Sequence, residues 1–144
     1  MLSTESISHI EMEWAGAEVM LSAMRSRSLI TFSRGRGAVI GVDRIIYNLP
    51  LLLAADVLCQ TLRIAKEEGQ FSAKKHTLGG LVKASKEILP WVDWDSIWEA
   101  VDRRNAIAHD GALYSRRECQ ESIDSIREQL VQWGIIQEKQ GVRP

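Results

Sequence analysis

Apolar residues recur at intervals of three or four along most of the chain, which is the spacing of amphipathic α-helices. The first such stretch predicts a helix that ends near Arg25 or Ser28, with Ser6 or Ser8 as its cap. Its apolar positions are Ile10, Trp14, Ala17, Leu21 and Met24. A core-facing helix is the favoured interpretation, and a seam against a partner helix is the alternative.

The most apolar part of the chain begins at Val42 and ends at the polar sequence Lys66–Gln70. Its pattern predicts a central helix that neighbours contact on several sides. Pro50 either begins a new helix here or kinks a continuous one, and the pattern leaves both options open.

The pattern predicts two more helices, the third and the last of the chain. The third covers about residues 77–89, because Pro90 stops it. The last covers about residues 115–133 and opens with Ser115 and Glu118 in the spacing of a capping box. With the fourth helix, described next, the pattern predicts an all-α fold, an up-and-down bundle of about five helices.

The fourth helix is predicted to start at Asp93 or Asp95 and to end at the turn Asp110–Gly111. Its apolar stripe consists of Trp94, Ile97, Trp98, Val101 and Ala108. Tryptophans at this spacing are more typical of core or dimer contacts than of base-stacking platforms. The dimer contact gains weight because these tryptophans belong to the helix whose last turns carry the candidate site.

Polar residues gather in the last turns of this helix, which read Arg104-Asn105-Ala106-Ile107-Ala108-His109. Five residues of α-helix place Arg104 and His109 roughly 140° apart around the axis. Such a spacing does not build a metal site of the kind in which two histidines share one face. The two side chains can serve one site if the helix frays before His109, or if a second copy faces the first across a two-fold axis.

The run Arg104–Gly111 resembles the HEPN superfamily, small all-α domains marked by an arginine, four to six residues and a histidine. The resemblance implies one HEPN-like domain over residues 1–144 that cleaves RNA as a homodimer, without a metal or a cofactor. It also implies a toxin or defence effector, with a protein antitoxin as a further partner. Some relatives carry a tyrosine two positions after the histidine, where this chain has Gly111, so regulation through that tyrosine is not expected.

The residues themselves suit such a reaction. A histidine can take the proton from the 2′-OH, or give one to the leaving 5′-oxygen, at neutral pH. An arginine can hold the developing negative charge with two parallel donors. Arg104 and His109 are therefore the candidate catalytic residues, and Asn105 could orient the histidine or hold a phosphate.

Three other arginines flank this motif and could contact the RNA backbone, with solvated surface charge as the equal alternative. They are Arg103, Arg116 and Arg117. Ion pairing of Arg104 with Glu99, Asp102 or Asp110, and a His109 that only complements the helix dipole, would give the motif a purely structural role. Two alternative functions remain: a non-catalytic module that binds a nucleotide or a partner protein, and a helix that mainly builds a homodimer.

An arginine-rich segment covers residues 25–44. Leu29–Phe32 and Ala38–Ile40 are β-branched enough to suggest a short hairpin around the basic loop Ser33–Gly37. This loop could act as a phosphate-contacting flap, but a solvated connection is slightly favoured.

The composition of the chain limits which other classes of protein it could belong to. The net charge of −1 gives no overall attraction to nucleic acid, so RNA contacts must be local. The N-terminus shows no signal peptide, and the longest apolar run, Leu49–Ala55, is far too short to span a membrane. Cys59 and Cys119 lie in helical patterns and are expected to be buried thiols in a reducing cytoplasm. The tail 137–144 is expected to be loose.

Overall fold

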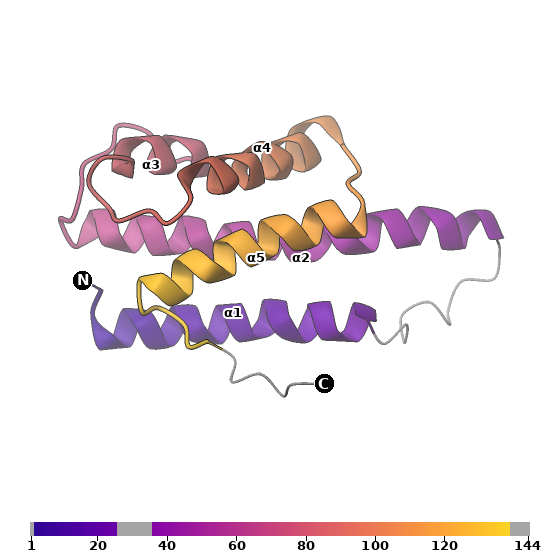
Figure 1. Cartoon of the computed structure of the whole chain (residues 1–144), viewed down its shortest axis with the longest axis horizontal. Coiled ribbons are helices and arrows are strands. Elements are labelled where there is room, and N and C mark those ends of the chain that lie inside the picture. Colours follow the sequence, from indigo (N-terminus) through magenta and orange to yellow (C-terminus); the bar gives the residue numbers. More distant parts are fainter. Residues whose placement is uncertain (1, 26–35, 139–144) are drawn as a thin grey trace.

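The computed structural model describes residues 2–25 and 36–138 of the chain, with side chains over 2–22 and 47–138. Over these residues the chain forms five helices packed into a bundle, without a strand, so the predicted all-α fold is confirmed (Figure 1). The helices are α1 (Thr4–Arg25), α2 (Arg36–Glu67), α3 (Leu78–Ser85), α4 (Trp94–Asp110) and α5 (Arg116–Gln132).

Helix α2 is the centre of the bundle and contacts each of the other four helices. In Figure 1, α1 runs along one side of α2, α3 and α4 lie along the opposite side, and α5 crosses in front. The first turns of α2 extend past the ends of the other helices. Helix α5 packs on both α2 and α4, and so joins the two sides of the bundle.

Leucines and isoleucines from every helix meet around α2 and are removed almost fully from solvent. The largest fully buried aliphatic side chains are Ile10, Leu51, Leu58, Leu62, Leu81, Ile97, Ile126, Leu130 and Ile135. Each contributes about 1.5–3 kcal/mol through burial. At the edge of this core, Arg127 of α5 donates to a carboxylate oxygen of Glu18 in α1 at 2.7 and 2.9 Å, which joins these two helices.

Pro50 lies inside α2, so the option of one continuous helix holds and the option of a new helix is wrong. Proline lacks the N–H that would bond four residues back, which costs a helix interior about 3 kcal/mol. The helix continues because its next turns place Leu51, Ala54 and Leu58 in the core.

Several sequence predictions are corrected by the helix positions. Ala38–Ile40 belongs to α2, so the predicted hairpin is wrong, and its other half, Leu29–Phe32, lies outside the described residues. Helix α1 begins at Thr4 instead of after Ser6 or Ser8. The α-helical part of the third helix ends at Ser85, before residue 89.

The helix ends follow the capping chemistry that the sequence predicts. Ser115 and Glu118 bond to each other's backbone N–H, both at 3.2 Å, and form the capping box of α5. Helix α4 ends at Gly111, whose φ of 64° is left-handed and therefore favours glycine. In the predicted loose tail, Gln137 and Glu138 are exposed, and the residues beyond them lie outside the described range.

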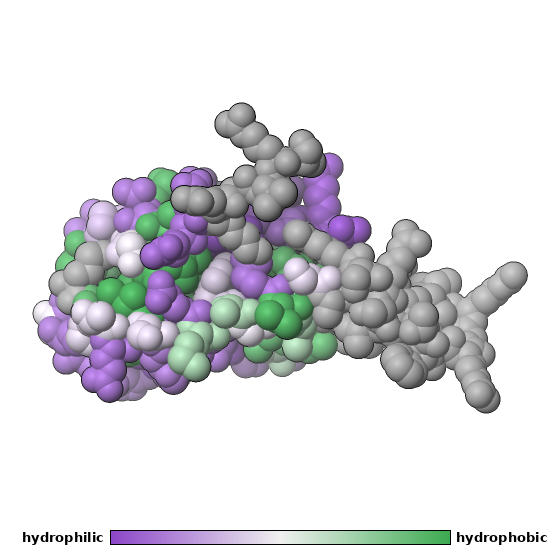
Figure 2. Space-filling view, turned by 90° about the horizontal axis from the view of Figure 1, so that it is seen from below, coloured by the Kyte–Doolittle hydropathy of each residue, from purple (hydrophilic) through white to green (hydrophobic). Residues whose placement is uncertain are grey.

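The face seen in Figure 2 mixes hydrophobic and hydrophilic residues. Met12 and Val19 of α1 are the most exposed large apolar side chains among the described residues, at 73% and 69%. The segment Tyr47–Glu67 of α2 is long and apolar enough to cross a membrane by length and composition alone. Most of it is buried inside the bundle, as expected for a core helix.

Candidate functional site

Helix α4 carries the arginine–histidine motif and is capped by Asp93. This side chain accepts from the Ser96 N–H at 3.1 Å and from the Ser96 hydroxyl at 2.7 Å, and these bonds lower the pKa of the Asp93 carboxyl. The helix runs without a break through His109 to Asp110. The option that the helix frays before His109 is therefore wrong, and Arg104 and His109 stay roughly 140° apart on one helix.

Arg104 is half-buried and lies close enough to α2 for its charge to act on Cys59. Its Nη1 donates to Oδ1 of Asn105 at 3.1 Å, so the two polar residues of the motif are held together. Burial raises the pKa of the Cys59 thiol in α2, and the positive charges of Arg63 and Arg104 act in the opposite direction. Among the described residues Arg104 makes no ion pair, so the predicted pairing with Glu99, Asp102 or Asp110 is not observed.

His109 lies in the last turn of α4, and its side chain is exposed. Within the described part of the chain the imidazole makes no hydrogen bond or ion pair. Ala108, which was predicted to belong to the apolar stripe, is exposed as well, so the prediction for this residue is wrong.

Arg103 is committed to the contact between α4 and α5. Its Nη1 donates to the Glu118 carbonyl at 2.8 Å and to the Ser122 hydroxyl at 3.0 Å, and its Nη2 pairs with Glu99 at 2.6 Å. The side chain is only 12% exposed. Its guanidinium lies 5.8 Å from the centre of the Tyr114 ring. These contacts use the donors that an RNA phosphate would need.

Arg116 and Arg117 open α5, across the short loop that follows His109. The Arg116 guanidinium stands over the Tyr47 ring at 5.6 Å, with an exposed side chain. Arg117 is 89% exposed and contacts Glu121 at 3.3 Å, a pairing worth little in water. Both side chains are accessible to a phosphate, whereas the side chain of Arg103 is not.

Asn48 of α2 was not singled out from the sequence, yet it holds the loop between α4 and α5. Its Oδ1 accepts from the Tyr114 N–H at 3.2 Å, and its Nδ2 donates to the Ala112 carbonyl at 3.4 Å. The Cys119 thiol also approaches Oδ1, at 3.4 Å. The available sequence signal was an asparagine between apolar residues of the most apolar helix, where a polar group needs partners.

Tryptophans of α4 lie against α3, away from the motif. Trp94 and Trp98 stack with ring centres 5.3 Å apart, with Lys86 over the first ring and Lys83 over the second. Trp98 also approaches the backbone of α3 at Gly79. Both indoles are partly buried and pack against the core, which fits the predicted core contact, and the predicted dimer contact stays a prediction.

The described residues contain no cluster of three or more histidine, cysteine or acidic side chains arranged to hold a metal ion. Cys59 and Cys119 are free and buried, as predicted. No family model, curated protein or solved structure matches this chain. The likeness to the HEPN superfamily therefore depends on the motif residues and the helical fold alone.

Proposed function

We propose that the protein is a metal-independent endoribonuclease of the HEPN type, with Arg104, Asn105 and His109 at its catalytic centre. The observation that carries this proposal is the contrast between two neighbouring arginines. Arg103 has four polar partners, whereas Arg104 bonds only to Asn105 among the described residues. A cation without an acidic partner, close in sequence to an exposed histidine, is the arrangement that binding an anion requires.

The reaction follows from the chemistry of these groups. One imidazole takes the proton of the 2′-OH, and the oxygen then attacks the adjacent phosphorus. The bond to the 5′-oxygen breaks, and a second imidazole returns a proton to that leaving group. The Arg104 guanidinium stabilises the charge on the non-bridging oxygens, and Asn105 fixes its direction. The products are a 2′,3′-cyclic phosphate and a free 5′-hydroxyl.

A homodimer is part of the proposal. One chain supplies one histidine to the motif, and the helix directs Arg104 and His109 to different sides. Two copies of α4 related by a two-fold axis would bring two of each side chain to one cleft. Arg116 and Arg117 would then flank the cleft and contact the RNA backbone, whereas Arg103 would act only through the α4–α5 contact. We further infer a toxin or defence effector in the cytoplasm, restrained by an antitoxin protein.

The test is RNA cleavage in EDTA by the purified protein and four variants. Arg104→Ala and His109→Ala are expected to lose at least a hundredfold in rate, the lower range for acid–base catalysis. Arg63→Ala and His9→Ala, which replace exposed residues of the same types on α2 and α1, should cleave like the wild type. Equal cleavage by all five proteins would contradict the proposal. Saturable RNA or nucleotide binding without cleavage would instead favour a non-catalytic binding module.

A further inference from the structure

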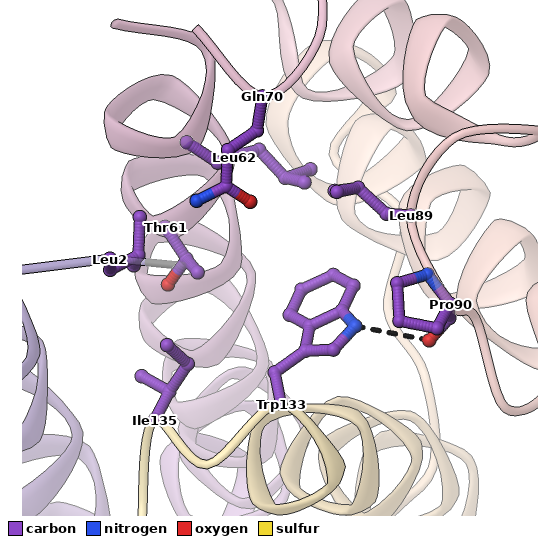
Figure 3. A pocket seen from close by; sticks show the side chains of 9 residues that line it. Leu2, Thr61, Leu62, Gln70, Leu89, Pro90, Trp133 and Ile135 are labelled. Atoms are coloured by element: carbon purple, nitrogen blue, oxygen red, sulfur yellow. Dashed lines mark hydrogen bonds between the residues drawn. The ribbon is translucent and has the colours of Figure 1, made fainter. Parts of the chain in front are cut away.

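A cavity of about 140 Å³ lies where α2 and α5 end (Figure 3). In Figure 1 these helix ends lie at the opposite end of the bundle from the C-terminus of α4. Leu62 and Ala65 of α2 form one wall, and Trp133 at the end of α5 forms another. Leu89 and Pro90, from the connection before α4, close the side opposite α2. The walls are mainly apolar, and no charged side chain lines the cavity.

Two helix ends of the same type frame this cavity. After α2 the chain turns at Gly69 with a φ of 81°, and the Gln70 N–H bonds to the Ala65 carbonyl at 3.0 Å. After α5 it turns at Gly134 with a φ of 72°, and the Ile135 N–H bonds to the Leu130 carbonyl at 2.9 Å. In both turns this hydrogen bond, from the residue after the glycine back to the last turn of the helix, fixes the position of that residue. Gln70 and Ile135 are therefore held in place as lining residues.

Two polar side chains around the cavity, Trp133 and Thr61, are hydrogen-bonded within the protein, and Gln70 is the exception. Trp133 Nε1 donates to the Pro90 carbonyl at 3.0 Å, as the dashed line in Figure 3 marks. The Thr61 hydroxyl donates to the Val57 carbonyl at 2.8 Å. The Gln70 Nε2 is shielded from bulk solvent, yet it has no hydrogen-bond partner within the described residues. In Figure 3 the Gln70 amide points in among the labelled side chains.

We propose that this cavity binds a small neutral molecule with an apolar body and one hydrogen-bond acceptor, which Gln70 contacts. An apolar cavity of about 150 Å³ is known to hold benzene, so a six-membered ring matches the volume. An unpaired buried amide donor is costly, and an acceptor on the guest removes this cost. The terminal torsion of a glutamine is broad, which lets Nε2 turn toward the guest.

The probes are cyclohexanone and methylenecyclohexane, which share one shape and differ in whether an oxygen or a CH₂ group projects from the ring. Binding is followed by NMR at the Trp133 indole N–H and the Gln70 side-chain amide. Cyclohexanone is expected to shift both signals and to bind about two- to tenfold more tightly, the effect of one hydrogen bond. Equal binding of the two probes, or no shift with either at millimolar concentration, would overturn the proposal and indicate a cavity that holds at most water.

Two variants locate the effect. Gln70→Leu keeps an apolar wall but removes the donor, so the preference for cyclohexanone should disappear while methylenecyclohexane still binds. Ala65→Leu fills the cavity from α2 and should abolish the binding of both probes. Circular dichroism confirms that each variant is folded. Unchanged selectivity in Gln70→Leu, or unchanged binding in folded Ala65→Leu, would contradict the assignment. No RNA enters this experiment, so its outcome is independent of the nuclease proposal.

Discussion

The side-chain oxygen of Asn48 accepts a hydrogen bond from the backbone N–H of Tyr114 at 3.2 Å, across 66 positions of sequence. With the bond from Asn48 to the Ala112 carbonyl, it ties the loop that follows His109 to the central helix. Asn48 is 4% exposed, so water cannot replace these contacts easily. The position of the motif relative to α5 therefore depends on a residue far from it in sequence.

Replacing Asn48 with alanine should destabilise the protein by about 1–3 kcal/mol, because the part-buried N–H of Tyr114 loses its acceptor. Urea unfolding measures the change. Leu49→Ala is the matched control, since the neighbouring side chain is 43% exposed and its loss should cost less. Equal stability of Asn48→Ala and wild type would show that the loop does not need this amide.

Replacing Arg103 with alanine should lower the stability of the protein more than replacing Arg104 does. Arg103→Ala leaves the Glu118 carbonyl and the Ser122 hydroxyl without their donor, and we expect a loss of about 1–3 kcal/mol in unfolding free energy. Arg104→Ala removes one bond to Asn105 and should change stability by less than about 1 kcal/mol. Thermal and urea unfolding of both variants test this. A larger loss in Arg104→Ala would assign that residue a structural role.

Because Asp93 caps α4, the free energy of unfolding should depend on pH in the acid range. Bonds from Ser96 hold the pKa of Asp93 below its ordinary value of 3.8, so the folded state favours the charged carboxylate. This stabilisation is complete above about pH 5 and is lost as the pH falls below 3.8 through the folded pKa. Asp93→Asn keeps a good cap but does not titrate. The stability difference between wild type and this variant should therefore shrink in acid, and a constant difference would contradict the assignment.

The two thiols should react slowly in the folded protein. Burial raises the pKa of Cys119 to about 11 and also raises that of Cys59, so neither forms much thiolate at neutral pH. A chromogenic disulfide reagent should modify both cysteines in urea and neither one rapidly without it. Rapid modification of Cys119 in the native protein would indicate that the loop held by Asn48 opens easily.

Periodicity and capping were enough to predict most of the fold. The apolar spacing and residues such as Ser115, Glu118 and Gly111 act locally, so five helices and several of their ends could be located from the sequence. The hairpin around residues 29–40 was wrong because β-branched residues also fit a long helix. Whether Pro50 ends a helix depends on the burial of the turns around it, which no local pattern shows.

The candidate site was only partly predictable. From the sequence, the spacing to His109 predicted a catalytic role for Arg104, whereas Arg103 was left open between an RNA contact and a solvated surface charge. The difference comes from α5, which supplies Glu118 and Ser122 to one arginine and leaves the other free of acidic partners among the described residues. Asn48 was missed for the same reason, since its partners lie more than sixty positions away. Long-range partners decide which polar residues are structural.

The most direct test of the central claim is the mass of the RNA fragments released in EDTA by wild type and by His109→Ala. Attack by the 2′-oxygen predicts fragments that end in a 2′,3′-cyclic phosphate, each lighter than the 3′-phosphate form by one water. These fragments should be formed by the wild type and be nearly absent with His109→Ala. Intact RNA with the wild type, or the same cyclic ends in equal amount from the variant, would contradict a nuclease site built on Arg104 and His109.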